Sequence, residues 1–108
     1  MRKRKINVMI LGTRYSVEIK NRTEDRLLWE RDGYCDRYEH RIVVAKQEKE
    51  AYEKEILRHE LTHAFLNESG LQDEMTHNER GHDEQMIDWF SIQYPKMKKV
   101  YEQLGCDK

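Results

Sequence analysis

The sequence predicts an α+β domain, in which an N-terminal antiparallel β-sheet packs against two helices from the second half of the chain. Three observations lead to this fold class. Apolar side chains recur at every second position in parts of the first 45 residues, which is the period of a half-buried strand. From residue 47 onward the period lengthens to 3.6 residues, which is typical of helices. Strands come first and helices follow, so we expect one α+β domain over residues 1–108.

The first element expected is a β-hairpin with arms at Ile6–Leu11 and Arg14–Lys20. Apolar and polar side chains alternate along the second arm, so one of its faces should be buried. Gly12 and Thr13 lie between the arms and fit a two-residue turn with glycine first.

The next stretch, residues 21–33, is predicted as either a loop or a short helical turn capped by Thr23. Residues Tyr34–Ala45 are strand-like in two pieces, separated at Glu39 and His40. The second piece, Arg41–Ala45, is apolar and rich in β-branched residues. We expect it to be antiparallel to its neighbours, because no helix separates it from the hairpin.

Two helices should follow. The first begins near Gln47, carries acidic residues in its first half, and stops at Gly70. Residues 71–81 are polar and predict a loop, and a second helix should begin near His82 or Asp83. Its apolar stripe comprises Met86, Ile87, Trp89, Phe90 and Ile92. Pro95 should kink or end this helix, with a further turn or two running to Leu104.

Composition excludes several classes of function. Charged residues make up 38% of the chain, but the net charge is only −1, so neither a nucleic acid nor a membrane surface is an expected partner. The longest N-terminal apolar run is too short for a signal peptide core or a membrane span. Cys35 and Cys106 lack metal-site spacing and read as reduced thiols of a cytoplasmic protein. The aromatic side chains, Trp29 and Trp89 among them, should fill a small core that a bound metal would stabilise.

The sequence His59-Glu60-Leu61-Thr62-His63 is an HExxH motif inside the first predicted helix. Side chains four residues apart share one helix face, so both imidazoles can reach one metal ion. Glu60 projects about 100° away from His59, where a carboxylate can take a proton from an attacking water molecule. Neutral imidazole suits zinc, which lowers the pKa of its water to about 7. Two solvated or core histidines on a plain helix face are the alternative interpretation.

A catalytic zinc ion needs a third protein ligand. The extended HExxHxxGxxH pattern is absent, because Leu66 and Ser69 occupy its positions. Glu84 and Asp88 share a face of the second helix, so Glu84 could bind zinc while Asp88 accepts a hydrogen bond from a ligand imidazole. Four alternatives remain open: Glu79, His77 and His82 as third ligand, and an ordinary solvated acidic face.

These features resemble the thermolysin-like gluzincin zinc metallopeptidases, in particular minimal single-domain members from bacteria and their phages. The likeness covers residues 33–93 and rests on the runs Gly33–Asp36, Arg41–Val44, His59–Leu66 and Glu84–Phe90. It implies one zinc ion held by His59, His63 and Glu84, with Glu60 as general base and Asp88 orienting a ligand histidine.

The resemblance also implies how a peptide substrate would bind. The strand Arg41–Ala45 would be the sheet edge on which an extended peptide lies. The second domain that supplies oxyanion donors in larger relatives has no counterpart in these 108 residues. The candidates for that role are Tyr34, Tyr38, His77, His82 and Tyr94, each of which also fits a structural or surface role.

Two functions are therefore weighed. The first is a zinc-dependent peptidase in the cytoplasm of a bacterium or a phage-infected cell. The second is a non-enzymatic interaction or regulatory domain that keeps a metallopeptidase fold and uses zinc to stabilise a thin core. The intact Glu60 favours the first, because a structural zinc site has no use for that carboxylate. A zinc deaminase would need an HxE pattern together with PCxxC, and PCxxC does not occur.

Overall fold

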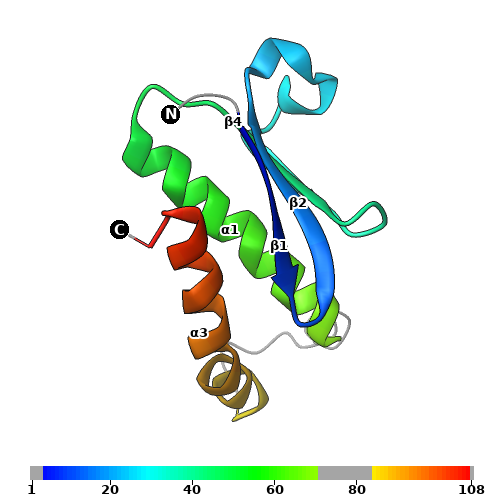
Figure 1. Ribbon diagram of the computed structural model, residues 1–108, viewed down its shortest axis with the longest axis vertical. Coiled ribbons are helices and arrows are strands. Elements are labelled where there is room, and N and C mark those ends of the chain that lie inside the picture. Colours follow the sequence, from blue (N-terminus) through cyan, green and yellow to red (C-terminus); the bar gives the residue numbers. More distant parts are fainter. Residues whose placement is uncertain (1–3, 71–83, 108) are drawn as a thin grey trace.

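The computed structural model describes residues 4–70 and 84–107. The strands are β1 (Arg4–Ile10), β2 (Thr13–Lys20), β3 (Gly33–Asp36) and β4 (Arg41–Ala45). Two 3₁₀ turns, η1 (Arg22–Glu24) and η2 (Arg26–Leu28), precede β3, and the helices are α1 (Glu50–Ser69) and α3 (Glu84–Leu104). One four-stranded sheet carries both helices on the same face, which confirms the α+β class (Figure 1).

The sheet is mixed, so the prediction of a wholly antiparallel sheet is wrong. Its strand order is β1-β2-β4-β3. β1 with β2 and β3 with β4 are antiparallel, whereas β2 and β4 are parallel, with Val17 opposite Ile42. The chain reverses direction through η1 and η2, runs back as the outer strand β3, and reverses again at residues 37–40. Two reversals restore the direction of β2, so β4 enters the sheet parallel to it without a helical crossover.

The hairpin turn lies one residue earlier than predicted. Ile10 pairs with Thr13, so the two loop residues are Leu11 and Gly12. Both have positive φ angles, 51° and 91°, as the type I′ turn requires. Glycine adopts this conformation without steric cost, and Leu11 takes the less favourable position beside it.

Helix α1 matches its predicted extent closely. It ends at Ser69, and Gly70 follows with a left-handed φ of 82°. At the other end the buried carboxylate of Glu53 accepts a hydrogen bond from the backbone N–H of Gln47 at 2.9 Å, which ties the β4–α1 connection to the first helical turn. Helix α3 continues through Pro95 to Leu104, so this proline does not end it.

The main core lies between the sheet and the two helices. Residues from β1, β2, β4, α1 and α3 form one buried cluster, which includes Tyr15, Ile42, Leu61 and Phe65. A smaller cluster of Leu28, Tyr34, Val43 and Ala45 covers the opposite face of the sheet.

Three predicted core positions are not buried. Trp29 is 61% exposed beside Arg26, and Phe90 and Ile92 on α3 are also exposed. Trp89 is buried as expected, and the other α3 side chains described as buried are Met97, Val100 and Leu104, in its C-terminal half. Buried apolar positions therefore continue past Pro95 into the last turns of α3, where a further turn or two was predicted.

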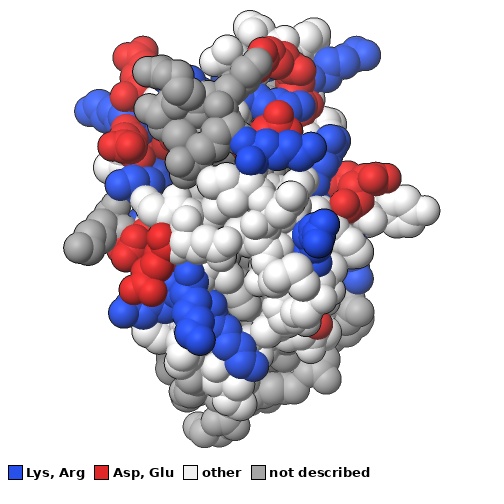
Figure 2. All heavy atoms as spheres, in the orientation of Figure 1, with Lys and Arg blue, Asp and Glu red and all other residues white. Residues whose placement is uncertain are grey.

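Acidic and basic side chains are interspersed on the face shown in Figure 2, in keeping with the near-zero net charge. Cys35 and Cys106 are both free thiols, the first half-buried and the second buried. Among the described residues, neither helix has the length and apolar character that crossing a bilayer requires.

Candidate metal centre and substrate groove

The HExxH motif lies in the middle of α1. His59 is exposed and His63 is half-buried. Their rings meet edge to face with centroids 4.9 Å apart and an interplanar angle of 72°. One turn of helix thus brings two imidazoles to a single surface position, and nitrogen donors of this kind suit zinc.

Glu60 lies beside the two histidines and is buried, with 8% of its surface exposed. Burial raises the pKa of its carboxyl group, and the positive charge of His59, His63 or Arg31 acts in the opposite direction. Gly33 at the start of β3 allows this close packing. A Cβ atom at that position would lie 3.0 Å from the Val43 carbonyl oxygen and 3.4 Å from Glu60 Cγ.

Two hollows flank the motif, and Gly33 and Glu60 line both of them. The hollow on the His59 side has a volume of about 300 Å³. Its remaining lining residues are Asp32, Tyr52, Glu55, Ile56 and His59. The hollow on the His63 side has a volume of about 390 Å³. Its remaining lining residues are Arg31, Tyr34, Cys35, Arg37, His63 and Asn67.

The predicted third ligand lies at the first residue of α3. Backbone geometry places Glu84 and Asp88 one helical turn apart in that helix. The side chains of Glu84 and Asp88, and the whole of Glu79, His77 and His82, lie outside the described residues. Within residues 4–70 and 84–107, no group of three or more His, Cys, Asp or Glu side chains is gathered for a metal. Two of the proposed zinc ligands are therefore described together, and the third remains a prediction.

The oxyanion candidates occupy different environments. The hydroxyl of Tyr34 donates to Asp25 Oδ2 at 2.6 Å, and burial with this hydrogen bond raises the pKa of the tyrosine to about 12. Tyr34 thus has a structural partner on the face of the sheet away from α1. Tyr38 and Tyr94 are 88% and 57% exposed.

Arg31, Arg37 and Asn67, which were not predicted from the sequence, line the hollow next to Glu60 and His63. Asn67 was detectable, because it follows His63 by four residues and must share its helix face. Arg31 and Arg37 flank β3, and their role depends on that strand lying against α1, which no local pattern indicates.

The prediction that Arg41–Ala45 forms an exposed sheet edge is wrong. β4 pairs with β2 on one side and β3 on the other, and Ile42 through Ala45 are fully buried. An apolar run of four residues is typical of an interior strand, and the flanking cations Arg41 and Lys46 are not specific enough to mark an edge. The sheet edge next to α1 is β3.

Among the described strands, only β4 pairs with β3, so the other side of the β3 backbone faces away from the sheet. The N–H of Ala45 donates to the carbonyl of Asp32, which identifies that pair as hydrogen-bonded. Hydrogen-bonded pairs alternate along an antiparallel ladder. The N–H and C=O groups of Gly33 and Cys35 therefore point away from β4, toward the free edge.

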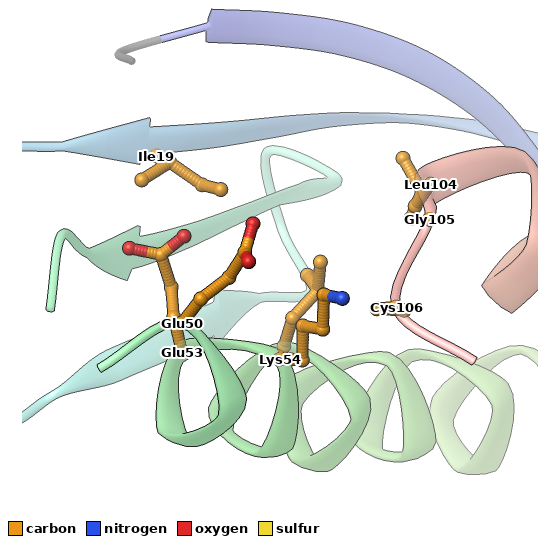
Figure 3. Close-up of a pocket in the computed structure, with 8 residues that line it drawn as sticks. Ile19, Glu50, Glu53, Lys54, Leu104, Gly105 and Cys106 are labelled. Carbon is orange, nitrogen blue, oxygen red and sulfur yellow. The ribbon is translucent and has the colours of Figure 1, made fainter. Parts of the chain in front are cut away.

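A separate hollow of about 290 Å³ lies between β2, the start of α1 and the C-terminal segment (Figure 3). Glu50 and Glu53 rise into it from α1, with Lys54 nearby. None of the HExxH residues lines this hollow. Because the Glu53 carboxylate already holds the Gln47 backbone, we assign this hollow to packing at the helix start.

Comparisons with protein-family models, with curated proteins and with solved structures find no match to this chain. The functional conclusion rests on the residues and their geometry.

Proposed function

We propose that this chain is a zinc-dependent metallopeptidase. The observation that carries the proposal is the grouping of His59, Glu60 and His63 at one position on α1, directly beside the free edge of β3. A structural zinc site would need the two imidazoles but not the carboxylate between them. A site for hydrolysis needs all three.

The ligand set fits zinc chemistry. His59 and His63 supply two nitrogen donors, and Glu84 is proposed as the third ligand, with Asp88 accepting a hydrogen bond from a ligand histidine. When bound, the zinc ion would polarise the scissile carbonyl and lower the pKa of water to about 7.

Glu60 carries the proton transfers. Its carboxylate accepts a proton from the attacking water molecule as the new C–O bond forms. It then donates that proton to the leaving amine as the C–N bond breaks. The buried position of Glu60 against Gly33 keeps the carboxylate close to the strand that receives the substrate.

The backbone of β3 positions the substrate. An extended peptide can pair with the free N–H and C=O groups of Cys35 and Gly33, because such pairing does not depend on the peptide's sequence. This arrangement would hold a peptide bond next to Glu60.

The substitution Glu60→Gln tests the proposal. It preserves the size of the side chain and removes the base, so zinc content should be unchanged while hydrolysis of a fluorogenic peptide library falls by about 10²–10⁴-fold. Glu102→Gln on α3 is the matched control and should keep full activity. Zinc content is measured by plasma mass spectrometry in all three proteins.

Activity of the Glu60→Gln protein within a few fold of wild type would contradict the role of Glu60. A zinc-loaded wild type that cleaves nothing in broad libraries would instead favour the non-enzymatic alternative. One observation favours this alternative. The Tyr34 hydroxyl donates its hydrogen bond to Asp25 and so does not serve as an oxyanion donor.

A further inference from the structure

The two hollows beside the HExxH motif differ in charge. Asp32, Glu55 and Glu60 line the hollow on the His59 side, and neither lysine nor arginine contributes to it among the described residues. Arg31 and Arg37 line the hollow on the His63 side. Glu60 lines both hollows and Asp32 is paired with Arg22, so the two hollows differ mainly by Glu55 on one side and the two arginines on the other.

Arg31 and Arg37 are both exposed. Within the described residues, neither the Arg31 nor the Arg37 guanidinium has a hydrogen-bond or ion-pair partner. Glu60 lines the same hollow, and its charge interacts with Arg31. Two other nearby carboxylates are held by hydrogen bonds. Asp36 accepts hydrogen bonds from the backbone of Tyr38 and Glu39, both at 3.0 Å, and Glu68 is bound by residues of β2.

Their positions match a bound strand. Arg31 precedes β3 and Arg37 follows it, so the two cations lie near opposite ends of the free edge. Six residues of extended chain span about 20 Å. A peptide bound along this edge would therefore place one of its side chains near Arg31 and a different one near Arg37.

We propose that this groove selects peptides carrying acidic side chains, with Arg31 and Arg37 as separate contacts for two acidic positions. The groove is the one defined by Arg31, Gly33, Cys35, Arg37 and Asn67. The choice of a peptide as ligand rests on the proposed function. A polyanion such as nucleic acid fits less well, because the adjoining hollow is acidic and the net charge of the chain is −1.

Binding to the Glu60→Gln protein tests this inference, because it does not depend on cleavage. The probes are two fluorescein-labelled octapeptides of alanine, leucine and serine that differ only in having two glutamates or two glutamines. We expect the glutamate peptide to bind several-fold more tightly by fluorescence anisotropy in 50 mM salt, and the difference to shrink in 500 mM salt. Moving a single glutamate along the peptide then locates the acidic positions.

Arginine variants in the same background assign the contacts. Arg31→Gln and Arg37→Gln should each weaken binding of the glutamate peptide about two- to fivefold, the range of a partly exposed ion pair. Binding of the glutamine peptide should not change. The two variants should lose discrimination at different glutamate positions. Arg14→Gln is the matched control, because it removes the same charge from an exposed position of β2 that lines neither hollow.

Equal affinity for the two peptides would overturn the inference, as would an Arg14→Gln effect as large as those at Arg31 and Arg37. Equally strong binding of a single-stranded oligonucleotide would also overturn it, because the groove would then be a general polyanion surface. If wild type cleaves peptides without preference for acid, this inference alone fails. If acidic peptides bind by these rules but wild type cleaves none, the proposed function fails and the groove remains a peptide-binding site.

Discussion

The carboxylate of Glu68 fastens the last turns of α1 to the hairpin. Its two oxygens accept hydrogen bonds from Thr13 Oγ1 and from the hydroxyl of Tyr15, both at 2.7 Å. His40 Nε2 lies 3.9 Å from Glu68 Oε2. Burial opposes ionisation of Glu68, but the hydrogen bonds from Tyr15 and Thr13 outweigh it and lower the pKa of this carboxyl group. Ionised Glu68 thus stabilises the junction on which the C-terminal half of the motif helix rests.

The substitution Glu68→Gln should make that contribution measurable. The folded-state pKa lies below the unfolded value of 4.5, so the stabilisation is fully present above pH 4.5 and is lost as pH falls through the folded-state pKa. We expect the free energy of unfolding to fall by about 1.5–3 kcal/mol at pH 7, the range of hydrogen bonds to a charged group. The gap to wild type should narrow below pH 4.5. Urea unfolding followed by tryptophan fluorescence measures the free energy of unfolding of both proteins, because Trp89 is buried in the core.

The control is Glu102→Gln, which makes the same chemical change on an exposed surface. Glu102 pairs only with Lys98, at 3.5 Å between two half-exposed side chains, and such i,i+4 pairs contribute about 0.3–0.5 kcal/mol. If Glu68→Gln lowers the free energy of unfolding by the same amount from pH 3 to pH 7, the side chain acts through packing and not through its charge.

At the scale of elements, the free edge of β3 is the feature on which substrate binding depends. The side chain of Cys35 faces α1, where Asn67 Nδ2 lies 3.9 Å from its sulfur. Burial, together with the charge of Glu60, raises the pKa of the thiol to about 12, so this side chain is a neutral packing group at neutral pH. The backbone N–H of Cys35, in contrast, points to the free edge.

Cys35→Pro should separate folding from peptide binding. Proline removes an N–H that makes no bond to β4, and edge strands tolerate proline at such positions. We expect the variant to fold and bind zinc as Cys35→Ala does, but to bind labelled peptides at least about fivefold more weakly, because a backbone hydrogen bond contributes about 1 kcal/mol. Circular dichroism, zinc content and anisotropy are compared for the two variants.

The interior strand supplies the contrasting case. Val43 is fully buried in β4 and lies opposite Tyr34 at a hydrogen-bonded position of the ladder. Val43→Pro removes a hydrogen bond from the middle of the sheet and should prevent folding. Unchanged peptide affinity in a folded Cys35→Pro protein would exclude β3 as the substrate strand.

Local signals predicted most elements, and the largest failures concerned contacts between segments far apart in the sequence. The alternation in β2, the apolar period of α1 and the glycine at position 70 each lie within one segment of sequence, and these elements were predicted to within a few residues. The position of β4 depends on where η1, η2 and β3 direct the chain, which no single segment records. The same holds for Arg31 and Arg37, whose side chains meet the motif only because β3 lies against α1.

At the scale of the whole molecule, the candidate centre combines a motif of residues close together in the sequence with residues from distant segments. His59, Glu60 and His63 were predictable because helix geometry alone places them together. Gly33 became part of the site only when the sheet brought it to Glu60. The third ligand is the hardest residue to predict from a single segment of sequence, because its position depends on where α3 starts after residues 71–83. The hydrogen bond from Trp89 Nε1 to Ser69 Oγ, at 2.7 Å, brings the beginning of α3 to the end of α1.

That junction leads to a prediction about zinc. With α3 anchored by Trp89 at the end of the motif helix, we expect one zinc ion per chain, bound by His59, His63 and Glu84. His63→Ala and Glu84→Ala should each abolish tight binding in competition with a chromophoric chelator. Asp88→Ala should weaken the affinity by about 10–100-fold, as loss of a group that orients a ligand does. At a free zinc concentration 100 times the dissociation constant, wild type should gain about 2.7 kcal/mol of stability.

Three matched substitutions test the choice of Glu84. Glu79→Ala, His77→Ala and His82→Ala remove the rival donors and should each leave both the zinc content and the zinc-dependent rise in melting temperature unchanged. If one of them loses the metal while Glu84→Ala keeps it, the third ligand comes from residues 77–82 and the assignment of Glu84 is wrong. A wild-type protein that purifies without zinc and gains no thermal stability from added zinc would contradict the metal centre itself, and with it the role of Glu60. The edge strand β3 and its flanking arginines would then have to be explained as a peptide-binding surface without hydrolysis.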